Sequence, residues 1–435
     1  MSALARVMVA QGVPVSGSDI RENRVIEDLR ELGVSVSIGH RAANVDGASE
    51  VVYSTAIKDD NPELRRAKEL GIPLIHRGEL LARIINQRRG VTVAGAHGKT
   101  TCSAMAGVLL TLAGWEPTVL VGGRIHQLGS NGWLGSGEFV VAEADESDGS
   151  FLMLHPWASL VTNVDQEHLD HYGSWEAIQE AFRRYLTHVR EVAVVCGDDP
   201  FLKEQAGCCN ASWVTYGFDS GNTYCCENLR SLNGSQWYTV LKEGDVIGEI
   251  TLPLVGRHNV LNSLGVVALL LEIGLPFEKI AEGLKEFKGV ERRLTRKGEA
   301  NDVLVIDDYG HHPTEIRATL EAVASGWPER RVKVLFQPHR YTRTKALLEE
   351  FWEAFGKAYG VFVLPIYPAG EEPNGVSHAD VARGIRERSC PNTLEVKGDP
   401  ISFLAEHLEE GDILLTMGAG DVWKIGEELV RRSDS

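Results

Sequence analysis

The sequence predicts an α/β protein of three domains, each built on a largely parallel sheet with helices on its faces. Two observations support this prediction. Short runs of apolar and β-branched residues alternate with helical patterns along the chain, and this order is typical of parallel sheets. With 435 residues, the chain is also too long for one ordinary hydrophobic core. Changes in the pattern place the domains at residues 1–88, 89–292 and 293–435.

The composition restricts the classes of partner. The net charge of −17 argues against a nucleic-acid partner or an anionic membrane surface, because both bind basic proteins. No run of about 18 apolar residues predicts a membrane span, and the N-terminal MSALARVMVAQG lacks the cleavage pattern of a secretory signal. The seven cysteines lack zinc-knuckle spacing, so free thiols and a cytoplasmic location are expected.

In the first domain, short strands and helices alternate. Strands are expected at residues 13–19, 35–38, 51–54 and 73–75. Helices are expected at residues 24–32 and 62–70. This alternation predicts a parallel sheet.

The second domain continues the alternation and ends in a hairpin and two helices. Strands are expected at residues 91–94, 118–121, 139–142, 159–163 and 191–195. The main helices are expected at residues 101–113, 175–188, 259–273 and 277–287. Residues 237–241 and 246–252 are expected to pair as a hairpin.

The third domain shows three clear strands, at residues 302–306, 331–336 and 412–417. Each strand runs directly into a polar loop, and a helical pattern follows. After the second strand, one face of a predicted helix carries the apolar side chains Leu347, Phe351, Ala354, Phe355 and Ala358. In such sheets, ligands bind at the carboxyl ends of the strands.

The stretch VTVAGAHGKTT, residues 91–101, predicts a phosphate-binding loop between a strand and a helix. It departs from the usual G-x-x-x-x-G-K-[ST] pattern, because valine occupies position 93 where glycine is expected. Gly95 and Gly98 still permit a tight turn at a helix N-terminus, where free N–H groups attract anions. Lys99 can reach the β and γ phosphates, and Thr100 can offer its hydroxyl to magnesium.

Two polar segments follow other strands of this domain. Residues 143–148, EADESD, hold four carboxylates, which would raise one another's pKa unless a cation compensates them. A magnesium ion fits such a loop, although a solvated acidic loop is the plain alternative. Residues 163–171 contain His168, which can bind a second metal or a phosphate, or can simply lie at the surface.

Four strings together resemble the motifs of the Mur ligase family, the ATP-dependent amide-forming enzymes of peptidoglycan synthesis. These strings are GAHGKTT (95–101), EADESD (143–148), DDYGHHPT (307–314) and QPHRYTRT (337–344). The resemblance covers nearly the whole chain. It implies a Rossmann-like UDP-sugar-binding domain (1–88), a central P-loop ATPase-like parallel sheet that binds ATP (89–292), and a Rossmann-like C-terminal domain for the amino acid (293–435).

The last three strings are most similar to the branch that adds the first amino acid. That similarity implies UDP-N-acetylmuramate and L-alanine as small-molecule substrates, joined through an acyl phosphate with release of ADP and phosphate. The oligomeric state stays open between a monomer and a homodimer.

The resemblance also implies the cofactors, ATP and two Mg²⁺ ions, and the residues that hold them. The ATP contacts would be Gly95, Ala96, His97, Gly98, Lys99, Thr100, Thr101, His258, Asn259 and Asn262. Thr100 and Glu143 would hold one Mg²⁺, and His168 the second. In several sister ligases a carbamylated lysine completes that second site, but no lysine occurs here between Lys99 and Lys203.

The remaining implied residues contact the other substrates or take part in the chemistry. The substrate-binding candidates are Ser18, Asp19, Ser54, Thr55, His76, Arg77, Tyr309 and His311. The catalytic candidates are Lys99, His168, His339, Arg340 and Arg343. A guanidinium binds oxyanions in a fork, which suits both arginines, although Arg–Asp pairs that fasten the domain are an alternative for each. The base that takes the proton of the amine stays open between His168 and His339.

The N-terminus departs from the family pattern. Family members normally begin with a strand and a GxGGxGMS-type loop that receives the UDP diphosphate. The printed chain begins MSALA, which resembles the residues just after that loop. We expect a misassigned start site or a real truncation, and weak UDP-sugar affinity if the short form is genuine, because the diphosphate would lose a helix N-terminus.

Other functions stay open at this point. A related recycling ligase could join a peptide to the same sugar, and a folate-type ligase could add glutamate. A regulator that binds nucleotide without catalysis is a candidate from another class. A P-loop ATPase that uses water as the nucleophile is less favoured, because no residue is marked as positioning a water molecule.

Overall fold

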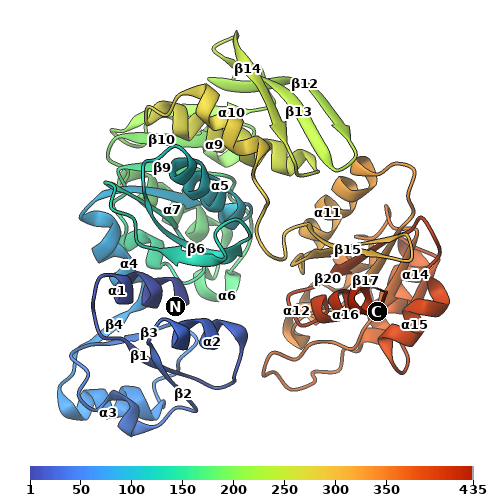
Figure 1. The fold of residues 1–435 in the computed structure, drawn as a ribbon, viewed down its shortest axis with the longest axis horizontal. Helices are drawn as coiled ribbons and strands as arrows, with labels where there is room; N and C mark the ends of the chain where they lie inside the picture. Colours follow the sequence, from blue (N-terminus) through green and yellow to red (C-terminus); the bar gives the residue numbers. More distant parts are fainter. Residues whose placement is uncertain (434–435) are drawn as a thin grey trace. The chain divides into compact units, whose positions relative to one another are not determined.

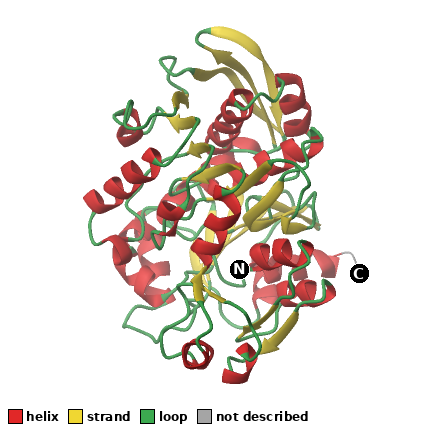
Figure 2. Cartoon of the chain, turned by 90° about the vertical axis from the view of Figure 1, so that its left-hand side faces the viewer, coloured by secondary structure: helices red, strands yellow, loops and turns green. Residues whose placement is uncertain are grey.

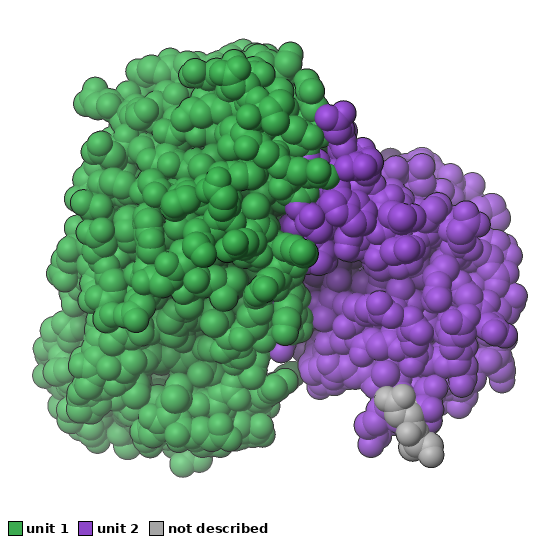
Figure 3. All heavy atoms as spheres, turned by 45° about the horizontal axis from the view of Figure 1, so that its top comes forward, with its two compact units in different colours: residues 1–227, 239–250, 261–288 green, residues 228–238, 251–260, 289–435 purple. Residues whose placement is uncertain are grey.

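The computed structural model describes residues 1–433, except for the side chain at position 170. These residues divide into two compact units (Figure 3). The first contains residues 1–227, 239–250 and 261–288, and the second contains residues 228–238, 251–260 and 289 onward. The three-domain boundaries near 88 and 292 stay a prediction.

The N-terminal part of the first unit consists of short strands and helices (Figure 1). They are α1 (Ser2–Ala10), β1 (Ser16–Asp19), α2 (Arg24–Glu31), β2 (Ser35–Ile38), η1 (Ala42–Val45), β3 (Val51–Tyr53), α3 (Pro62–Leu70), β4 (Leu74–His76) and α4 (Arg77–Asn86). The strands and helices that we predicted are all present, within a few residues. They form two parallel pairs, β1–β2 and β3–β4, instead of the one sheet that we expected.

Local chemistry explains where these helices begin and end. Asn61 caps α3 by accepting a hydrogen bond from the backbone N–H of Glu63, and Pro62 occupies the first turn. Gly71, with φ 69°, ends the helix in the left-handed conformation. Helices α1 and α4 were not predicted; α4 begins directly at the end of β4, with no turn between them.

A ten-stranded sheet follows in the chain, in the order β14-β13-β12-β11-β10-β9-β5-β8-β6-β7. Its strands are β5 (Arg89–Ala94), β6 (Thr118–Ile125), β7 (Ser130–Trp133), β8 (Phe139–Glu143), β9 (Ala158–Val161), β10 (Val192–Cys196), β11 (Ser212–Gly217), β12 (Tyr224–Leu232), β13 (Ser235–Lys242) and β14 (Asp245–Leu252). The strands from β11 to β6 run parallel, as predicted, and β7 pairs antiparallel with β6. The sequence analysis missed β7, β11 and β12, although it predicted the β13–β14 hairpin.

Seven helices and helical turns lie in the same part of the chain as this sheet; Figure 2 shows the helices of the whole chain in red. They are α5 (Lys99–Leu112), η2 (Ser150–Met153), α6 (Leu169–Tyr172), α7 (Trp175–Thr187), α8 (Pro200–Lys203), α9 (Arg257–Glu272) and α10 (Phe277–Lys285). Nearly all of α5 is buried, because it follows the central strand β5 and packs on the sheet. This burial fixes the start of α5, and with it the phosphate loop, to the middle of the sheet.

The second unit carries a six-stranded sheet in the order β15-β16-β20-β17-β18-β19. The strands are β15 (Thr295–Ala300), β16 (Val303–Asp308), β17 (Val332–Phe336), β18 (Gly360–Val363), β19 (Thr393–Glu395) and β20 (Ile413–Met417). All of them are parallel except β15, which pairs antiparallel with β16. The helices are α11 (Pro313–Gly326), α12 (Tyr341–Ala346), α13 (Leu348–Trp352), α14 (His378–Arg388), α15 (Pro400–His407) and α16 (Trp423–Ser433).

The helix predicted from the apolar face around Phe351 is wrong in its extent. Within this stripe only α13 is helical, because the helix ends at Trp352 and residues 353–357 form turns. Phe351 and Phe355 nevertheless both pack in one hydrophobic core under β17. Burial of the apolar stripe is therefore preserved without a continuous helix, so the pattern marked the core and not the length of the helix.

The order of the central strands brings three loops together. Strands β8, β5 and β9 are adjacent and parallel, so their carboxyl ends lie at one edge of the sheet. The loops after them contain the GKTT motif, the acidic run and the His168 segment. Separately, no helix within residues 1–433 is long and apolar enough to cross a membrane.

Candidate functional site

The phosphate loop lies between β5 and α5, and its two glycines fit it closely. Gly95 has φ 128° and Gly98 has φ 84°, values that favour glycine. A Cβ on Gly95 would collide with the hydroxyl of Thr162, and a Cβ on Gly98 with the side-chain amide of Asn262. The loop therefore has its glycines where the backbone is crowded, and Asn262 of α9 lies directly against it.

Hydrogen bonds hold this loop against the segment that follows β9. The Thr162 hydroxyl donates to the carbonyl oxygen of His97 at 2.6 Å, and the backbone N–H of His97 donates to Asn163 Oδ1 at 2.9 Å. Nε2 of His97 lies 3.1 Å from Asp165 Oδ2. His97 is thus bonded inside the protein, and its predicted contact with ATP stays a prediction.

Lys99 stands at the first turn of α5, with its ammonium inside the loop. Nζ donates to the carbonyl oxygens of Gly95 and Ala96 and to the carboxylate of Glu146, which lies 2.9 Å away. Burial by itself would lower the pKa of Lys99, but the charge and hydrogen bond of Glu146 raise it above its ordinary value. The amine therefore stays cationic, and its partners are two carbonyl oxygens of the loop and a carboxylate.

Thr100 and Glu143 lie together, as the sequence predicted. The Thr100 hydroxyl donates to Glu143 Oε2 at 3.2 Å, and the N–H of Gly122 donates to the other oxygen. Burial raises the pKa of Glu143 above its ordinary value, because an ionised carboxylate loses its water there. A hydroxyl and a carboxylate are oxygen donors of the kind that magnesium prefers, so these residues fit the ion.

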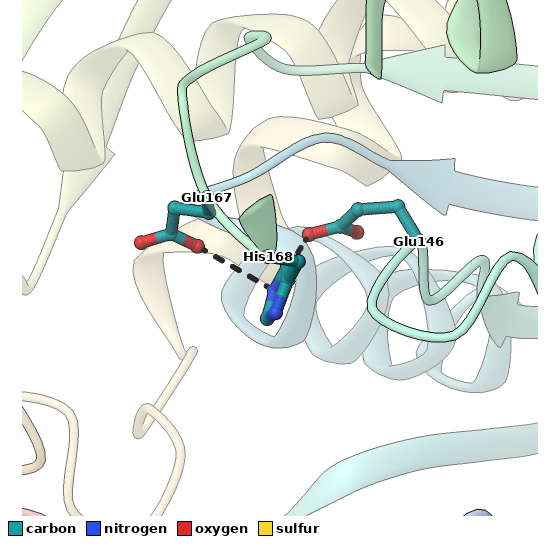
Figure 4. Close-up of side chains that lie close together, drawn as sticks. All are labelled: Glu146, Glu167 and His168. Carbon is teal, nitrogen blue, oxygen red and sulfur yellow. Dashed lines mark ion pairs between the residues drawn. The ribbon is translucent and has the colours of Figure 1, made fainter. Parts of the chain in front are cut away.

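His168 lies beside two carboxylates, those of Glu146 and Glu167 (Figure 4). Nε2 of His168 is 3.5 Å from Glu146 Oε1 and 3.8 Å from Glu167 Oε2. One ligand atom from each of the three residues lies within 4.8 Å of the others. The hydrogen bond to Glu146 raises the pKa of His168, although burial opposes this shift. This donor set fits a divalent cation, and the sequence analysis assigned only His168 of the three to it.

The predicted UDP-sugar contacts fall into two clusters in the first unit. In one, the Ser18 hydroxyl donates to Glu63 Oε2 at 2.8 Å and lies 2.9 Å from Nδ1 of His40. In the other, Thr55 lies 3.0 Å from Nε2 of His76, and Arg77 follows as the first residue of α4. Asp19 ends β1, next to Ser18, and Ser54 precedes Thr55.

Arg77 is bound differently from what the sequence analysis expected. Its Nη2 lies 2.7 Å from Asp145 Oδ2 and 2.8 Å from Asp148 Oδ2. The acidic run is therefore compensated partly by an arginine from the N-terminal region. This pairing could not be predicted from a local pattern, because the residues are 68 and 71 positions apart in the sequence.

The second unit holds a cluster at the carboxyl ends of β16 and β17. The rings of Tyr309 and His311 are 5.2 Å apart, those of His311 and His339 are 6.2 Å apart, and Arg343 Nη1 lies 3.5 Å from Nδ1 of His339. Burial lowers the pKa of His311 and of His339 to about 4 each, and Arg343 adds to both shifts. Both imidazoles are therefore neutral near pH 7. Arg340 adopts φ 68° and ψ 136°, a conformation unusual for a residue other than glycine.

Three of the predicted ATP contacts lie at the start of α9. His258 and Asn259 lie in its first turn, and Asn262 follows one turn later. Asn259 is buried and its side chain donates to the carbonyl oxygen of Val255 at 2.8 Å. Asn262 is the member of this group that lies against the phosphate loop.

Two further acidic residues were quoted in a motif but given no role. Asp307 and Asp308 end β16 and are buried, and Asp307 lies 3.4 Å from Nε of Arg292. Burial raises the pKa of Asp308 to about 6. Buried carboxylates at the end of a strand are a recognisable signal of a site, but their burial could not be known from the sequence.

Comparisons with known proteins agree with this geometry. The chain matches three family descriptions: "Mur ligase family, catalytic domain" over residues 1–89, "Mur ligase middle domain" over residues 93–270, and "Mur ligase, glutamate ligase domain" over residues 292–420. It is similar to UDP-N-acetylmuramate–L-alanine ligase of Desulfosudis oleivorans, with 45% identity over 99% of this chain and 95% of that protein. The same protein of Trichlorobacter lovleyi is 45% identical, over 99% and 96% of the two chains.

Solved structures give the same result. A UDP-N-acetylmuramate–alanine ligase from Thermotoga maritima matches with a TM-score of 0.86 and 29% identity, over 100% of this chain and 96% of that chain. A murein peptide ligase from Psychrobacter arcticus matches with a TM-score of 0.71 and 22% identity, over 99% and 96% of the chains. At 22% identity, the similarity to the murein peptide ligase concerns the fold alone.

Proposed function

The chain belongs to the Mur ligase family, whose members depend on ATP, and we propose that it joins L-alanine to the carboxylate of UDP-N-acetylmuramate in peptidoglycan precursor synthesis. One observation carries this proposal. Lys99, Thr100 and Glu143 converge at the edge of the central sheet, in a chain 45% identical over 99% of its length to a UDP-N-acetylmuramate–L-alanine ligase.

The chemistry requires activation of the acceptor. An amine cannot displace oxygen from a carboxylate at neutral pH, because the carboxylate is anionic and its leaving group is poor. The acceptor carboxylate oxygen attacks the γ-phosphorus of ATP, the bond to ADP breaks, and an acyl phosphate forms. The free amine of alanine then attacks the acyl carbon, phosphate leaves, and the amine loses a proton to a base.

Lys99 and the loop amides would hold the phosphates during this transfer. We propose two Mg²⁺ ions, one held by Thr100 and Glu143 and the second by His168 with Glu146 and Glu167. Magnesium, when bound, spreads the negative charge of the migrating phosphoryl group. Glu146 and Glu167 would supply the carboxylate that a modified lysine supplies in sister ligases. ATP would also contact Gly95 to Thr101 and His258, Asn259 and Asn262.

The other substrates would be held by the remaining candidates. We propose that residues 1–88 bind the UDP-sugar through Ser18, Asp19, Ser54, Thr55, His76 and Arg77. Residues 293–435 would bind alanine through Tyr309, His311, His339, Arg340 and Arg343, while residues 89–292 bind ATP. Since both nucleotide substrates belong to the cytoplasm, we also propose that location for the protein.

A coupled ADP-release assay tests the function. We expect ADP release that requires both UDP-N-acetylmuramate and L-alanine, and much weaker release with each of the other nineteen amino acids. Release with the tripeptide L-alanyl-γ-D-glutamyl-meso-diaminopimelate in place of alanine would assign the chain to peptide recycling instead. Nucleotide binding without any ADP release would identify a non-catalytic regulator.

A further inference from the structure

Asp148 joins two parts of the first unit that are far apart in the sequence. Its Oδ2 accepts hydrogen bonds from the Thr55 hydroxyl at 2.6 Å and from Arg77 Nη2 at 2.8 Å. The same oxygen lies 3.6 Å from Nε2 of His76. Thr55, His76 and Arg77 are three of the six residues proposed above to hold the UDP-sugar.

The surroundings of Asp148 hold it as a buried anion. Its side chain is only 6% exposed, and its Oδ1 accepts the backbone N–H of Ser150 at 3.0 Å. Both carboxylate oxygens of Asp148 are therefore held by donors inside the protein.

Helix α4 is held at both ends against the segment that follows the acidic run. At its start, a Cβ on Gly78 would collide with Ser150. At its end, Asn86 Nδ2 donates to the carbonyl oxygen of Met153 at 3.1 Å, and its Oδ1 accepts the N–H of His155 at 2.8 Å. Arg77 and the helix that it begins are therefore held against residues 148–155 at both ends.

The acidic run that contains Asp148 also contains residues of the phosphate site. Glu143 is bonded to Thr100, and Glu146 is paired with Lys99. Asp145 shares the guanidinium of Arg77 with Asp148. Asp148 lies only two positions after Glu146 and five after Glu143, the residues proposed to hold magnesium.

We propose that Asp148 is a positioning residue that couples the two substrate sites, so that occupation of the UDP-sugar site strengthens binding of magnesium–ATP, and the reverse. The inference rests on the proposed function, since it takes the UDP-sugar and ATP as the ligands. By linkage, each ligand must change the affinity of the other by the same factor. Couplings of this kind are commonly about 5- to 150-fold.

The test compares Asp148→Asn with the unchanged protein. Asparagine keeps the volume of the side chain and an oxygen for Ser150, but it loses the charge that holds Arg77. The dissociation constant of a non-hydrolysable ATP analogue with Mg²⁺ is measured with and without saturating UDP-N-acetylmuramate, and the reverse titration is made as well. Arg83→Gln is the matched control, because Arg83 lies on the same helix and pairs with Glu50 and Glu79 at the surface.

We expect the unchanged protein and Arg83→Gln to bind the analogue at least about 5-fold more tightly when the UDP-sugar is present. In Asp148→Asn this ratio should fall to near one, while the affinity of each ligand alone changes less than the ratio does. Thr55→Val, which removes one of the same hydrogen bonds, should lower the ratio partway. A thermal unfolding curve for each variant identifies any that fail to fold.

The possible failures are distinguishable. If the unchanged protein binds both ligands and Asp148→Asn retains the full ratio, the inference is wrong and the proposed function stands. If the unchanged protein binds the ATP analogue equally tightly with and without the UDP-sugar, the inference is also wrong and the proposed function stands. If the unchanged protein binds neither ligand, the proposed function is wrong and the inference falls with it.

Discussion

Lys99 and Glu146 form a buried ion pair inside the phosphate loop, with 2.9 Å between nitrogen and oxygen. The side chain of Glu146 is 3% exposed and that of Lys99 is 15% exposed. The cation proposed to hold the phosphates of ATP is thus already paired with a carboxylate of the protein. Two separate roles of Lys99, in stability and in catalysis, follow from this pairing.

Lys99→Met should destabilise the protein, because the buried Glu146 carboxylate would lose its ammonium partner and keep only His168 beside it. Removal of one member of a buried pair costs about 3 kcal/mol. Lys99→Met combined with Glu146→Gln should regain most of that stability, since no uncompensated charge is left. Urea denaturation of the two variants measures the difference.

The same two variants separate stability from catalysis. Loss of the Lys99 charge should lower kcat by at least about 100-fold, a magnitude typical of a lost transition-state contact. The double variant, although stable, should stay inactive. Recovered ADP release in the double variant would show that Lys99 acts only by balancing Glu146.

The pairing of Lys99 with Glu146 also shows where sequence reasoning ends. The glycines, Lys99 and Thr100 form one continuous motif, so their position between a strand and a helix was predictable. Glu146 lies 47 residues further along the chain, and its contact with Lys99 depends on β8 lying next to β5. Strand order is set by the packing of the whole sheet, which no local pattern encodes.

Burial and chain packing also explain where the structure of the second unit differs from the prediction. The loop strings of the third domain were predicted as ligand-binding because each follows a strand, and His311 and His339 do lie together. Their depressed pKa values depend on burial, which the sequence does not show. The early end of α13 at Trp352 was not predictable either, since the apolar spacing around Phe351 continues past it to Ala358.

Metal binding at His168 should release a proton. The ligand-free protein holds the pKa of His168 above 6.5, through the hydrogen bond to Glu146 and the charge of Glu167. A protonated imidazole cannot bind a metal, so binding must displace that proton. Calorimetry of Mn²⁺ binding in buffers of different ionisation enthalpy should give more than about half a proton released per ion at that site near pH 6.5. The number should fall toward zero at high pH.

The stability of the metal-free protein should also depend on His168, and it should fall as the pH rises. Because its pKa is higher in the folded state, its contribution is fully present below pH 6.5 and is lost as the pH rises through the raised value. His168→Gln should remove both this dependence and the proton release. His171→Gln, three residues away on α6, is the control and should retain both. Unchanged proton release in His168→Gln would assign the proton to another group.

His311 and His339 should make the protein sensitive to acid. Each has a pKa of about 4 in the folded state, below the ordinary 6.5, so the unfolded chain binds more protons between these values. Stability from this source is full above pH 6.5 and is lost as the pH falls toward 4. Denaturant unfolding between pH 4.5 and 8 measures it. His339→Gln should flatten the slope, whereas His378→Gln, in the same unit with a partly exposed ring, should not.

Arg340 gives a test of backbone strain at the proposed amino-acid site. Its φ of 68° lies in a region that costs a residue with a Cβ roughly 1–3 kcal/mol. Arg340→Ala and Arg340→Gly both lose the guanidinium, but glycine adopts this conformation without strain. Both variants should therefore raise KM for alanine to a similar extent, by at least about 10-fold if the guanidinium holds the carboxylate.

The two Arg340 variants should differ in stability. After allowance for the greater entropy of glycine in the unfolded chain, Arg340→Gly should be more stable than Arg340→Ala by about 1 kcal/mol. Thermal unfolding and alanine-dependent ADP release on the same preparations measure both properties. Equal stability of the two variants would mean that the backbone at this position is relaxed. A normal KM for alanine in both variants would show that the Arg340 guanidinium does not bind alanine. Arg340 would then serve only the structure of its loop.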